Sequence, residues 1–334
     1  MFKTDKTIKP YETRAAGFLG LSRLPVVEDG QLKVCKNMVF DQFPVMSVRN
    51  GRTLAGTVTG TPQAIIAAGA ATPFHFGFLQ SSSSDGLQVD NSTLEDAVKG
   101  LRALKMVGSN VSMPNKTVVG QYLDELSPAA QMCGAVNTIV NDNGKLIGHI
   151  TDGIGYMQSL KDNNIDVIGK KMTITGAGGA AKAIEVQAAL DGVKEMSIFN
   201  IKDKFWEAAE KTVETIRNNT DCIVNLYDLD DKEKLREEIA DSYLFAQATG
   251  VGMKPLEGQS VVPDKSFFRP DLIVTDTIYS PRETALLKMA KEAGCKTMNG
   301  LGMMLFQGDA AFYLWTGKHM PIEHMKEVLD IKYD

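Results

Sequence analysis

The sequence lacks the marks of several protein classes. Its four cysteines, Cys35, Cys133, Cys222 and Cys295, are far apart and form no CxxC pair. We therefore expect neither a zinc cage nor a disulfide framework, but buried thiols in a reducing cytosol. No run of about 18 apolar residues occurs, and the first residues, MFKTDKTIKPYETR, are polar where a signal peptide is apolar. We expect a cytoplasmic protein that neither crosses nor enters a membrane.

An excess of basic residues is also missing. The formal net charge is -5, whereas binding to nucleic acid or to an anionic membrane needs clustered Lys and Arg to displace counterions. We expect a small-molecule substrate and no nucleic-acid partner. The sequence leaves open whether the chain is a monomer or a homodimer.

Length and composition indicate a globular protein with two domains. The chain has 334 residues, of which 43% are hydrophobic and 23% are charged. It therefore exceeds the size at which a single core stops growing, about 250 to 300 residues. Strand and helix patterns alternate from about residue 90, which predicts an α/β fold with a parallel sheet.

Hydrophobic periodicity and turn residues predict the individual elements. Residues 1–50 carry short apolar runs with turns at 29–30 and 50–51, typical of strands and hairpins. We expect helices over 93–104, from 116, over 154–163 and in the tail 302–329; strands ending at 110–111 and over 195–200, 221–225, 244–248 and 272–276; a hairpin at 142–144; and a surface loop at 81–86.

A glycine-rich turn follows a β-rich run and precedes a helix. It reads Gly176, Ala177, Gly178, Gly179, Ala180 and Ala181. In this G-x-G-x-x-A spacing the first glycine permits a tight turn, the second lets the backbone approach a pyrophosphate, and the final alanine permits close packing of helix on strand. We interpret the turn as the phosphate site of a nicotinamide dinucleotide in an oxidoreductase. The alternative is a flexible turn without a ligand.

The end of the next strand distinguishes NAD from NADP. Asn200 can hydrogen-bond the ribose, and Asp203 can accept from its hydroxyls while repelling a 2′-phosphate. We therefore expect NAD rather than NADP. Lys202 and Lys204 can instead swing to a 2′-phosphate, but an exposed polar helix start explains both lysines more simply.

Two polar segments before the glycine turn can supply a proton donor for hydride chemistry. They are GSNVSMPNK at 108–116 and GHITDGIG at 148–155. A Lys ammonium beside a carboxylate can polarise an oxygen and pass a proton, which points to Lys116 and Asp152. A solvated helix start for Lys116 and a helix cap for Asp152 fit the same spacing, and the spacing does not separate these interpretations.

Seven motifs, in order, resemble those of the shikimate/quinate dehydrogenase family. They are NVSMPNK (110–116), GAVNTIV (134–140), TDGIG (151–155), GAGGAAKAI (176–184), GMKPL (252–256), DTIYSPRET (276–284) and GMMLFQGDAAFYLWTG (302–317). The resemblance runs from about residue 90 to 330. It implies a substrate-binding domain, 1–153, rejoined by C-terminal helices from 302–334, and a Rossmann-type doubly wound NAD-binding domain, 154–301, with catalysis in the cleft.

The resemblance also implies roles for individual residues. Lys116, as the acid/base, and Asp152 would contact the hydroxyl that is oxidised. The other implied positions are Asn137 and Gln307 on the ring hydroxyls, Asn110 ordering the Lys loop, Tyr279 near substrate and nicotinamide, Thr249 on the cofactor, and Gly302 and Met303 by the nicotinamide. Gln247 stands where the family has Asn. For the Met and aromatic residues of the tail we expect core positions.

The sequence departs from the family pattern at two places. Ile201 replaces the first Arg of the family's adenosine-binding strand end, and that Arg is the residue best suited to a 2′-phosphate. This sharpens the expectation of NAD and of the quinate/shikimate branch. In the N-terminal loop, Ala70 and Thr72 fall where the family has two carboxylate-binding serines. Either another group binds the carboxylate, with Thr72, His75 or Arg23 as candidates, or the substrate lacks it; we favour the first.

The resemblance thus implies an NAD-dependent enzyme of aromatic amino acid biosynthesis. It would reversibly oxidise a ring hydroxyl of shikimate to 3-dehydroshikimate, or of quinate to 3-dehydroquinate. Two alternatives stay open: a dehydrogenase for a different cyclic polyol or amino analogue, and a dinucleotide-binding regulatory protein without turnover. The intact Lys116, Asp152 and Gln307 argue against the second alternative.

Overall fold

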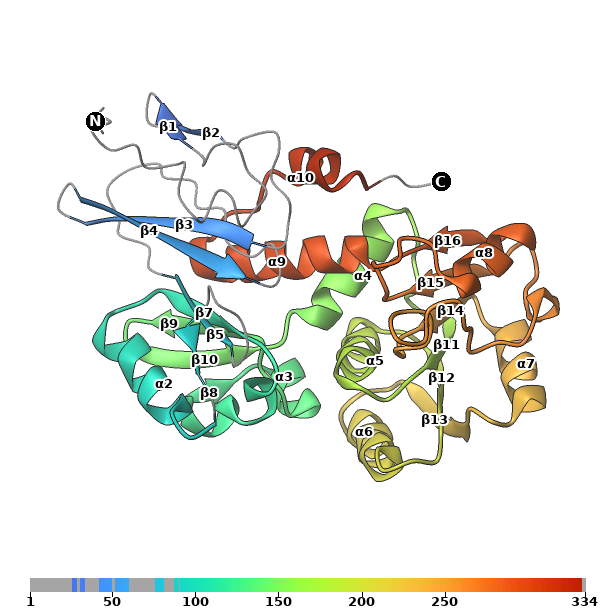
Figure 1. The fold of residues 1–334 in the computed structure, drawn as a ribbon. Helices are drawn as coiled ribbons and strands as arrows, with labels where there is room; N and C mark the ends of the chain where they lie inside the picture. The colour runs from blue at the N-terminus through green and yellow to red at the C-terminus, as the bar shows by residue number, and fades with distance from the viewer. Residues whose placement is uncertain are drawn as a thin grey trace. The chain divides into compact units, whose positions relative to one another are not determined.

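The chain folds into two units, each built around its own six-stranded sheet (Figure 1). The computed structural model describes residues 26–28, 31–33, 42–49, 52–59, 76–80, 87–89 and 91–331, with side chains at 89 and 91–331. The first unit comprises Met1–Ala130, Gly134–Thr151 and Gly308–Ile331. The second comprises Gln131–Cys133, Asp152–Gln307 and Lys332–Asp334.

The first unit has a mixed sheet in the order β6-β5-β7-β9-β10-β8. Its strands are β5 (Phe76–Gln80), β6 (Leu87–Gln88), β7 (Gly108–Val111), β8 (Glu125–Leu126), β9 (Thr138–Asp142) and β10 (Lys145–His149), accompanied by α2 (Leu94–Ala103) and α3 (Pro128–Cys133). The β9–β10 hairpin confirms the predicted turn, because Asn143 and Gly144 both have positive φ, 51° and 102°, as a two-residue hairpin turn of type I′ requires.

The predicted N-terminal hairpins are confirmed where the structure describes them. β1 (Val26–Glu28) pairs antiparallel with β2 (Gln31–Lys33), and β3 (Gln42–Arg49) pairs antiparallel with β4 (Arg52–Thr59). The predicted turns at 29–30 and 50–51 lie outside the described residues. The surface loop predicted at 81–86 lies outside the described residues.

The second unit has an all-parallel sheet in the order β13-β12-β11-β14-β15-β16. Its strands are β11 (Lys171–Thr175), β12 (Glu195–Asn200), β13 (Ile223–Asp228), β14 (Leu244–Gln247), β15 (Ile273–Asp276) and β16 (Lys296–Met298). Numbered along the chain, this is the 3-2-1-4-5-6 order of the doubly wound dinucleotide-binding fold. The predicted α/β fold class is confirmed.

Helices cover both faces of this sheet. α5 (Gly179–Asp191) and α6 (Trp206–Asn219) lie on one face, and α7 (Lys232–Asp241) and α8 (Ala285–Glu292) lie on the other (Figure 1). Alternate residues of each strand serve the two faces. The α7 and α8 side forms a continuous core that includes Phe199, Leu235, Ile239, Phe245, Val274, Leu286 and Leu287. α4 (Asp152–Asp162) packs closely on α5, because a Cβ on Gly153 would overlap the Ala183 carbonyl.

The tail forms two helices where the sequence predicted one helical segment. α9 (Leu301–Thr316) ends at Gly317, whose φ is 68°, and α10 (Ile322–Leu329) begins after Pro321. A glycine in the left-handed region followed by a proline ends a helix. Core positions are confirmed for Met303, Phe306, Phe312, Trp315, Met320 and Met325. Met304 is half-buried, and Tyr313 is exposed, at 47%.

The helix predicted from Lys116 is wrong in type. The chain there makes two short 3-10 segments, Asn115–Thr117 and Val119–Tyr122. β-branched residues fill 117–119, and such residues lose side-chain freedom in an α-helix.

The buried thiols are confirmed for Cys133, Cys222 and Cys295, while Cys35 lies outside the described residues. Within the described part of the chain, no helix combines the length and apolar character needed to span a bilayer.

Candidate functional site

The Lys116 loop of the first unit is held by buried backbone and amide contacts. Lys116 itself is half-buried, and its carbonyl accepts from Val136 N at 2.8 Å. The neighbouring Asn115 is fully buried and donates from Nδ2 to the Val89 carbonyl at 2.8 Å. The backbone that carries the Lys116 side chain is therefore held in place by hydrogen bonds on both sides of the loop.

Asn137 lies beside this loop at the entry to β9. Its Oδ1 accepts from Thr151 N at 2.9 Å and from the Thr138 hydroxyl at 2.9 Å, and its Nδ2 donates to the Thr151 hydroxyl at 3.1 Å. Asn110, 4% exposed, donates to the Asn137 carbonyl at 3.4 Å. The amide of Asn137 is thus fixed in orientation, and among the described residues only one of its two N–H groups has an acceptor. Such an N–H can donate to a ligand hydroxyl.

The glycine turn of the second unit lies at the switch point of the sheet, between β11 and β14. Gly176 has a φ of 113°, and a Cβ there would lie 2.8 Å from the Ala248 carbonyl oxygen. A side chain is therefore excluded at Gly176 by both conformation and space. Ala181, the last residue of the G-x-G-x-x-A spacing, is fully buried, as close packing of helix on strand requires.

The same turn fits a dinucleotide pyrophosphate. Gly178 precedes α5, and neither Gly178 nor Gly179 has any atom within 4 Å of the place a Cβ would take. Residues 178–180 are exposed, so the N-terminus of a helix of 13 residues is accessible to a ligand. Unpaired amides at a helix N-terminus bind phosphate oxygens. Ligands of open α/β sheets bind at such a switch point, outside the carboxyl ends of the strands.

The residues predicted to lie near the adenosine ribose are at the end of β12 and directly after it. Asn200 is 8% exposed and donates to the Ile201 carbonyl at 2.9 Å, and Asp203 accepts from Phe205 N at 2.8 Å. Lys202 Nζ lies 3.4 Å from the carboxylate of Asp228, the last residue of the neighbouring β13. A backbone hydrogen bond from Asp230, with a smaller contribution from Lys202, lowers the pKa of Asp228. Lys202 therefore faces a carboxylate at the sheet edge.

On the other side of β11 lie Gln247 and Asp276, which the sequence did not single out as functional. They are the last residues of β14 and β15 and are paired in register. Gln247 Oε1 accepts from Thr249 N, and the Thr249 hydroxyl accepts from Val251 N at 3.0 Å. Tyr279, in the segment after β15, is 48% exposed. Thr249 and Tyr279 both follow carboxyl ends of strands, as a dinucleotide site in this fold requires.

The first half of α9 carries Gly302, Met303 and Gln307. Met303 and Gln307 are 8% and 4% exposed, and Gln307 Nε2 donates to the Met304 carbonyl at 3.2 Å. A Cβ on Gly155 of α4 would overlap the backbone at Met303 and Gln307, so α4 and α9 pack without space between them. Asp152 is the half-buried first residue of α4.

Thr72, His75 and Arg23, the predicted carboxylate ligands, lie outside the described residues. Asn110, Asn137 and Lys116 belong to the first unit; Asp152, the glycine turn, Asn200, Lys202, Asp203, Thr249, Tyr279, Gly302, Met303 and Gln307 belong to the second. The sequence missed the residues that orient these groups, chiefly Thr138 and Thr151 around Asn137. Both stand inside the quoted motifs; Thr138 neighbours Asn137 in the sequence, whereas Thr151 is 14 residues away from it.

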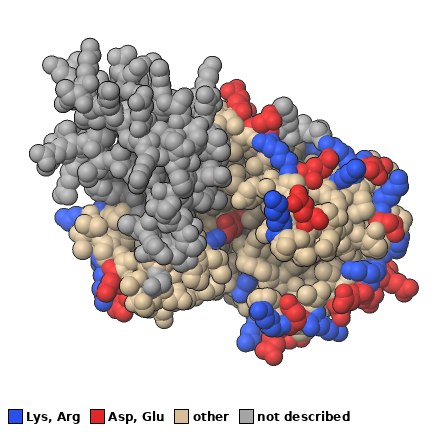
Figure 2. Space-filling view, viewed as in Figure 1, with Lys and Arg blue, Asp and Glu red and all other residues tan. Residues whose placement is uncertain are grey.

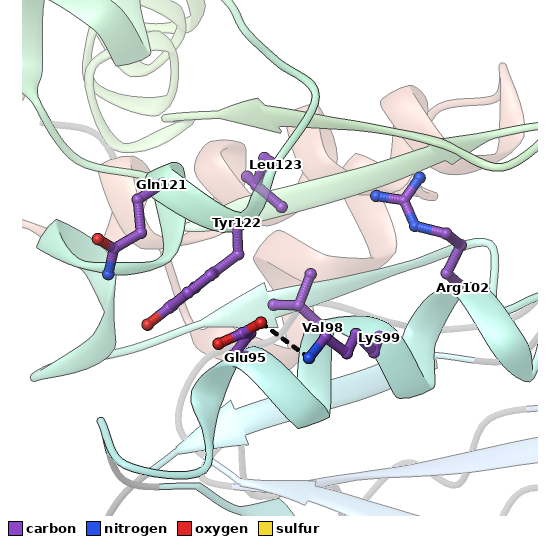
Figure 3. Close-up of a pocket in the computed structure, with 7 residues that line it drawn as sticks. All are labelled: Glu95, Val98, Lys99, Arg102, Gln121, Tyr122 and Leu123. Atoms are coloured by element: carbon purple, nitrogen blue, oxygen red, sulfur yellow. Dashed lines mark ion pairs between the residues drawn. The ribbon is translucent and has the colours of Figure 1, made fainter.

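A separate hollow of about 350 Å³ lies in the first unit and contains none of the predicted residues (Figure 3). Glu95, Val98, Lys99, Arg102, Gln121, Tyr122 and Leu123 line it. Its charges are already paired, Lys99 with Glu95 at 2.7 Å and Arg102 with Asp124 at 2.8 Å, so it offers little to a charged ligand.

On the face shown in Figure 2, acidic and basic side chains are interspersed. Among the described residues no group of three or more His, Cys, Asp or Glu could hold a metal ion.

Comparison with known proteins gives two family matches. The family model described as the shikimate dehydrogenase substrate binding domain matches residues 81–139, and the shikimate 5'-dehydrogenase C-terminal domain matches residues 300–329. A shikimate dehydrogenase (NADP(+)) of Listeria monocytogenes serotype 4b (strain F2365) is 60% identical over 242 residues, which are 72% of this chain and 83% of the relative.

Solved structures give the same similarity. Shikimate 5-dehydrogenase from Listeria monocytogenes, in complex with shikimate and NAD, is 59% identical with a TM-score of 0.72, over 73% of this chain and 84% of that one. Quinate dehydrogenase from Corynebacterium glutamicum, in complex with NAD, is 29% identical with a TM-score of 0.65, over 75% and 86%.

Proposed function

The chain belongs to the shikimate dehydrogenase family, and we propose that it reversibly oxidises a ring hydroxyl of shikimate with a nicotinamide dinucleotide. It is an oxidoreductase acting on CH–OH groups. The observation that carries the choice of substrate is the 60% identity over 242 residues to a relative named shikimate dehydrogenase. Quinate is the second candidate, because a structure with 29% identity is named quinate dehydrogenase.

The two units divide the work in this proposal. The first carries the substrate groups, with the free N–H of Asn137 donating to a ring hydroxyl and Asn110 fixing the adjacent backbone. Gln307 of the second unit would bind another ring hydroxyl. The second unit binds the dinucleotide, with pyrophosphate on the amides after Gly178 and the nicotinamide near Thr249, Tyr279, Gly302 and Met303. Thr72 remains the proposed ligand of the substrate carboxylate.

Lys116 is the proposed acid/base. When bound, the nicotinamide supplies the hydride acceptor for oxidation and the hydride donor for the reverse reaction. Lys116 accepts the hydroxyl proton during oxidation and returns it during reduction, with Asp152 as its acidic partner. The fixed backbone around Asn115 limits the freedom of the Lys116 loop, which favours a reactive orientation.

For the cofactor we propose NAD over NADP. Ile201, 44% exposed, occupies the place of the family's Arg, and Lys202 already faces Asp228. A 2′-phosphate bound here would lie near two carboxylates, those of Asp203 and Asp228. The Listeria relative is named for NADP(+), and the Listeria structure carries NAD, so the test must include both cofactors.

The test follows reduced nicotinamide by its near-ultraviolet absorbance, with each of NAD and NADP against each of shikimate and quinate. We expect the highest kcat/KM for shikimate with NAD. Lys116→Ala should lower kcat by at least about 100-fold, the usual contribution of a positioned acid/base, whereas Lys99→Ala on α2 should leave it unchanged. Full turnover by Lys116→Ala where chemistry limits the rate would refute the assignment. Dinucleotide binding without oxidation of either acid would favour a regulatory protein.

A further inference from the structure

Gln247 and Asp276 form a buried polar pair beneath the loops that follow β14 and β15. Their exposed fractions are 0% and 2%. Asp276 Oδ1 accepts from Gln247 Nε2 at 3.1 Å and from Ile278 N at 2.9 Å, and its Oδ2 accepts from the Thr284 hydroxyl at 2.7 Å. Gln247 Nε2 also donates to the Val251 carbonyl at 3.0 Å. Every polar atom of the two side chains is therefore used.

These bonds connect three segments at the carboxyl edge of the sheet. Thr277 N donates to the Gln247 carbonyl at 2.9 Å, and Gly300 N donates to the Ile278 carbonyl at 3.0 Å. Gly300 also approaches the 277–278 backbone so closely that a Cβ would overlap it. Hydrogen bonds and close backbone contacts thus join the loop at 247–252, the segment 277–279 and the start of α9, and the Gln247–Asp276 pair links the first two.

Resting on the proposed function, we propose that Gln247 and Asp276 are positioning residues for the nicotinamide half of the dinucleotide. They hold Thr249, Tyr279 and the Gly300–Met303 turn in register at the switch point, without touching the cofactor themselves. The side chain of Gln247 contacts Thr249 N, the Val251 carbonyl and Asp276 at once.

The charge of Asp276 suits this role. Three hydrogen-bond donors converge on its carboxylate, which is the acceptor-only form of the side chain. Burial raises the pKa of Asp276 to about 6, against the opposing effect of those three donors, so the carboxylate form prevails at neutral pH. In Asp276→Asn an amide N–H would face one of these donors, and the loops must separate to relieve the conflict.

The experiment separates the two halves of the dinucleotide. Dissociation constants of the full-length protein are measured by calorimetry for NAD and for ADP-ribose, which lacks the nicotinamide, or for NADP and 2′-phospho-ADP-ribose if NADP is the cofactor. We expect Gln247→Met and Asp276→Asn to weaken the full dinucleotide about tenfold, the effect of one hydrogen bond to a charged group. ADP-ribose binding and the KM for shikimate should change less than about twofold.

Matched variants exclude a general loss of structure. Gln259→Met, at an exposed position, and Thr284→Ser, which retains the hydroxyl, should behave as the unsubstituted protein. Circular dichroism checks folding, and if Asp276→Asn does not fold, Gln247→Met decides. Equal weakening of both ligands, or of neither, overturns the proposal. If instead the unsubstituted protein binds no dinucleotide or does not oxidise shikimate, the proposed function itself fails, so the two failures are distinguishable.

Discussion

Glu185 offers a test of how the second unit is stabilised. It lies in the middle of α5, is 1% exposed, and its Oε1 has no hydrogen-bond partner in the part of the chain that the structure describes. Burial raises its pKa to about 8, and the charge of Lys182, one turn earlier, offsets this only in part.

The adjacent Cys133 thiol lies 3.8 Å from the Lys182 carbonyl. Burial raises the pKa of this thiol to about 12, with Glu185 and Asp152 adding to the effect.

The direction of the pH dependence follows from proton uptake. Between pH 4.5, the ordinary pKa of the side chain, and pH 8 the folded chain keeps a proton that the unfolded chain has released. The free energy of unfolding therefore falls as the pH rises through this window, by up to about 1.4 kcal/mol per pH unit. Below pH 4.5 both the folded and the unfolded chain are protonated at Glu185, and no stability is lost. At pH 8 the loss in the free energy of unfolding reaches up to about 5 kcal/mol.

Glu185→Leu removes the ionisable group while keeping a similar volume. We expect it to raise the free energy of unfolding of the second unit by about 3 kcal/mol at pH 7 and by little at pH 5. Urea unfolding is followed by Trp206 fluorescence from pH 5 to 8.5 in a Trp315→Phe background, since Trp206 lies in the second unit and Trp315 in the first. This choice of probe keeps the unfolding of the two units apart.

Glu214→Leu is the matched control, because Glu214 is exposed on α6 of the same unit. It should leave the pH dependence of unfolding as it is in the unsubstituted protein. If the difference between Glu185→Leu and the unsubstituted protein were the same at pH 5 and pH 8, Glu185 would not hold a proton in the folded state, and the reasoning would be refuted.

Three further substitutions test the two units and the cofactor site. Trp315→Phe removes the hydrogen bond from Nε1 to the Ile139 carbonyl, 2.9 Å long and buried, and should lower the stability of the first unit by about 1 to 3 kcal/mol in urea unfolding. Burial opposes the ionisation of Glu238, but hydrogen bonds from Lys171 and neighbouring groups lower its pKa to about 2. Its stabilisation is therefore present above pH 4.5 and lost as the pH falls towards 2, and Glu238→Gln should weaken the acid dependence of unfolding. Ile201→Arg should raise kcat/KM for NADP relative to NAD about tenfold, and an unchanged ratio would show that this position does not meet the 2′ end.

The glycine turn and its flanking elements were predictable because their signals are local. The strand predicted at 195–200 matches β12 (Glu195–Asn200) to the residue. A tight turn needs glycine at Gly176 whatever surrounds it. β13 was predicted at 221–225 but spans Ile223–Asp228, because its second half, Leu226–Asp228, mixes apolar and acidic residues at a sheet edge. There the strand is set by pairing with β12 rather than by its own pattern.

The candidate site was predictable only in part. Lys116, Asp152 and Asn137 lie in recognisable motifs, but the contacts that orient them join residues far apart in the chain, as Asn115 joins Val89 and Asn137 joins Thr151. A one-dimensional pattern records which residue types are present and not which carbonyl a side chain reaches. The Gln247–Asp276 pair was missed for the same reason, since 29 residues separate two side chains that are 3.1 Å apart.

Glu185 shows where sequence patterns mislead about burial as well as about contacts. A glutamate in a helix is normally expected on the solvated face. In α5, however, Ala183 faces α4 while Ala181, Ile184 and Ala188 are also fully or nearly fully buried, so the helix has little solvated face along its middle turns. A carboxyl group placed there is not hydrated in any orientation of the side chain. Its raised pKa is therefore a consequence of how this fold encloses α5, and a substitution that removes the ionisable group should stabilise the unit at neutral pH without disturbing the glycine turn at the start of the same helix.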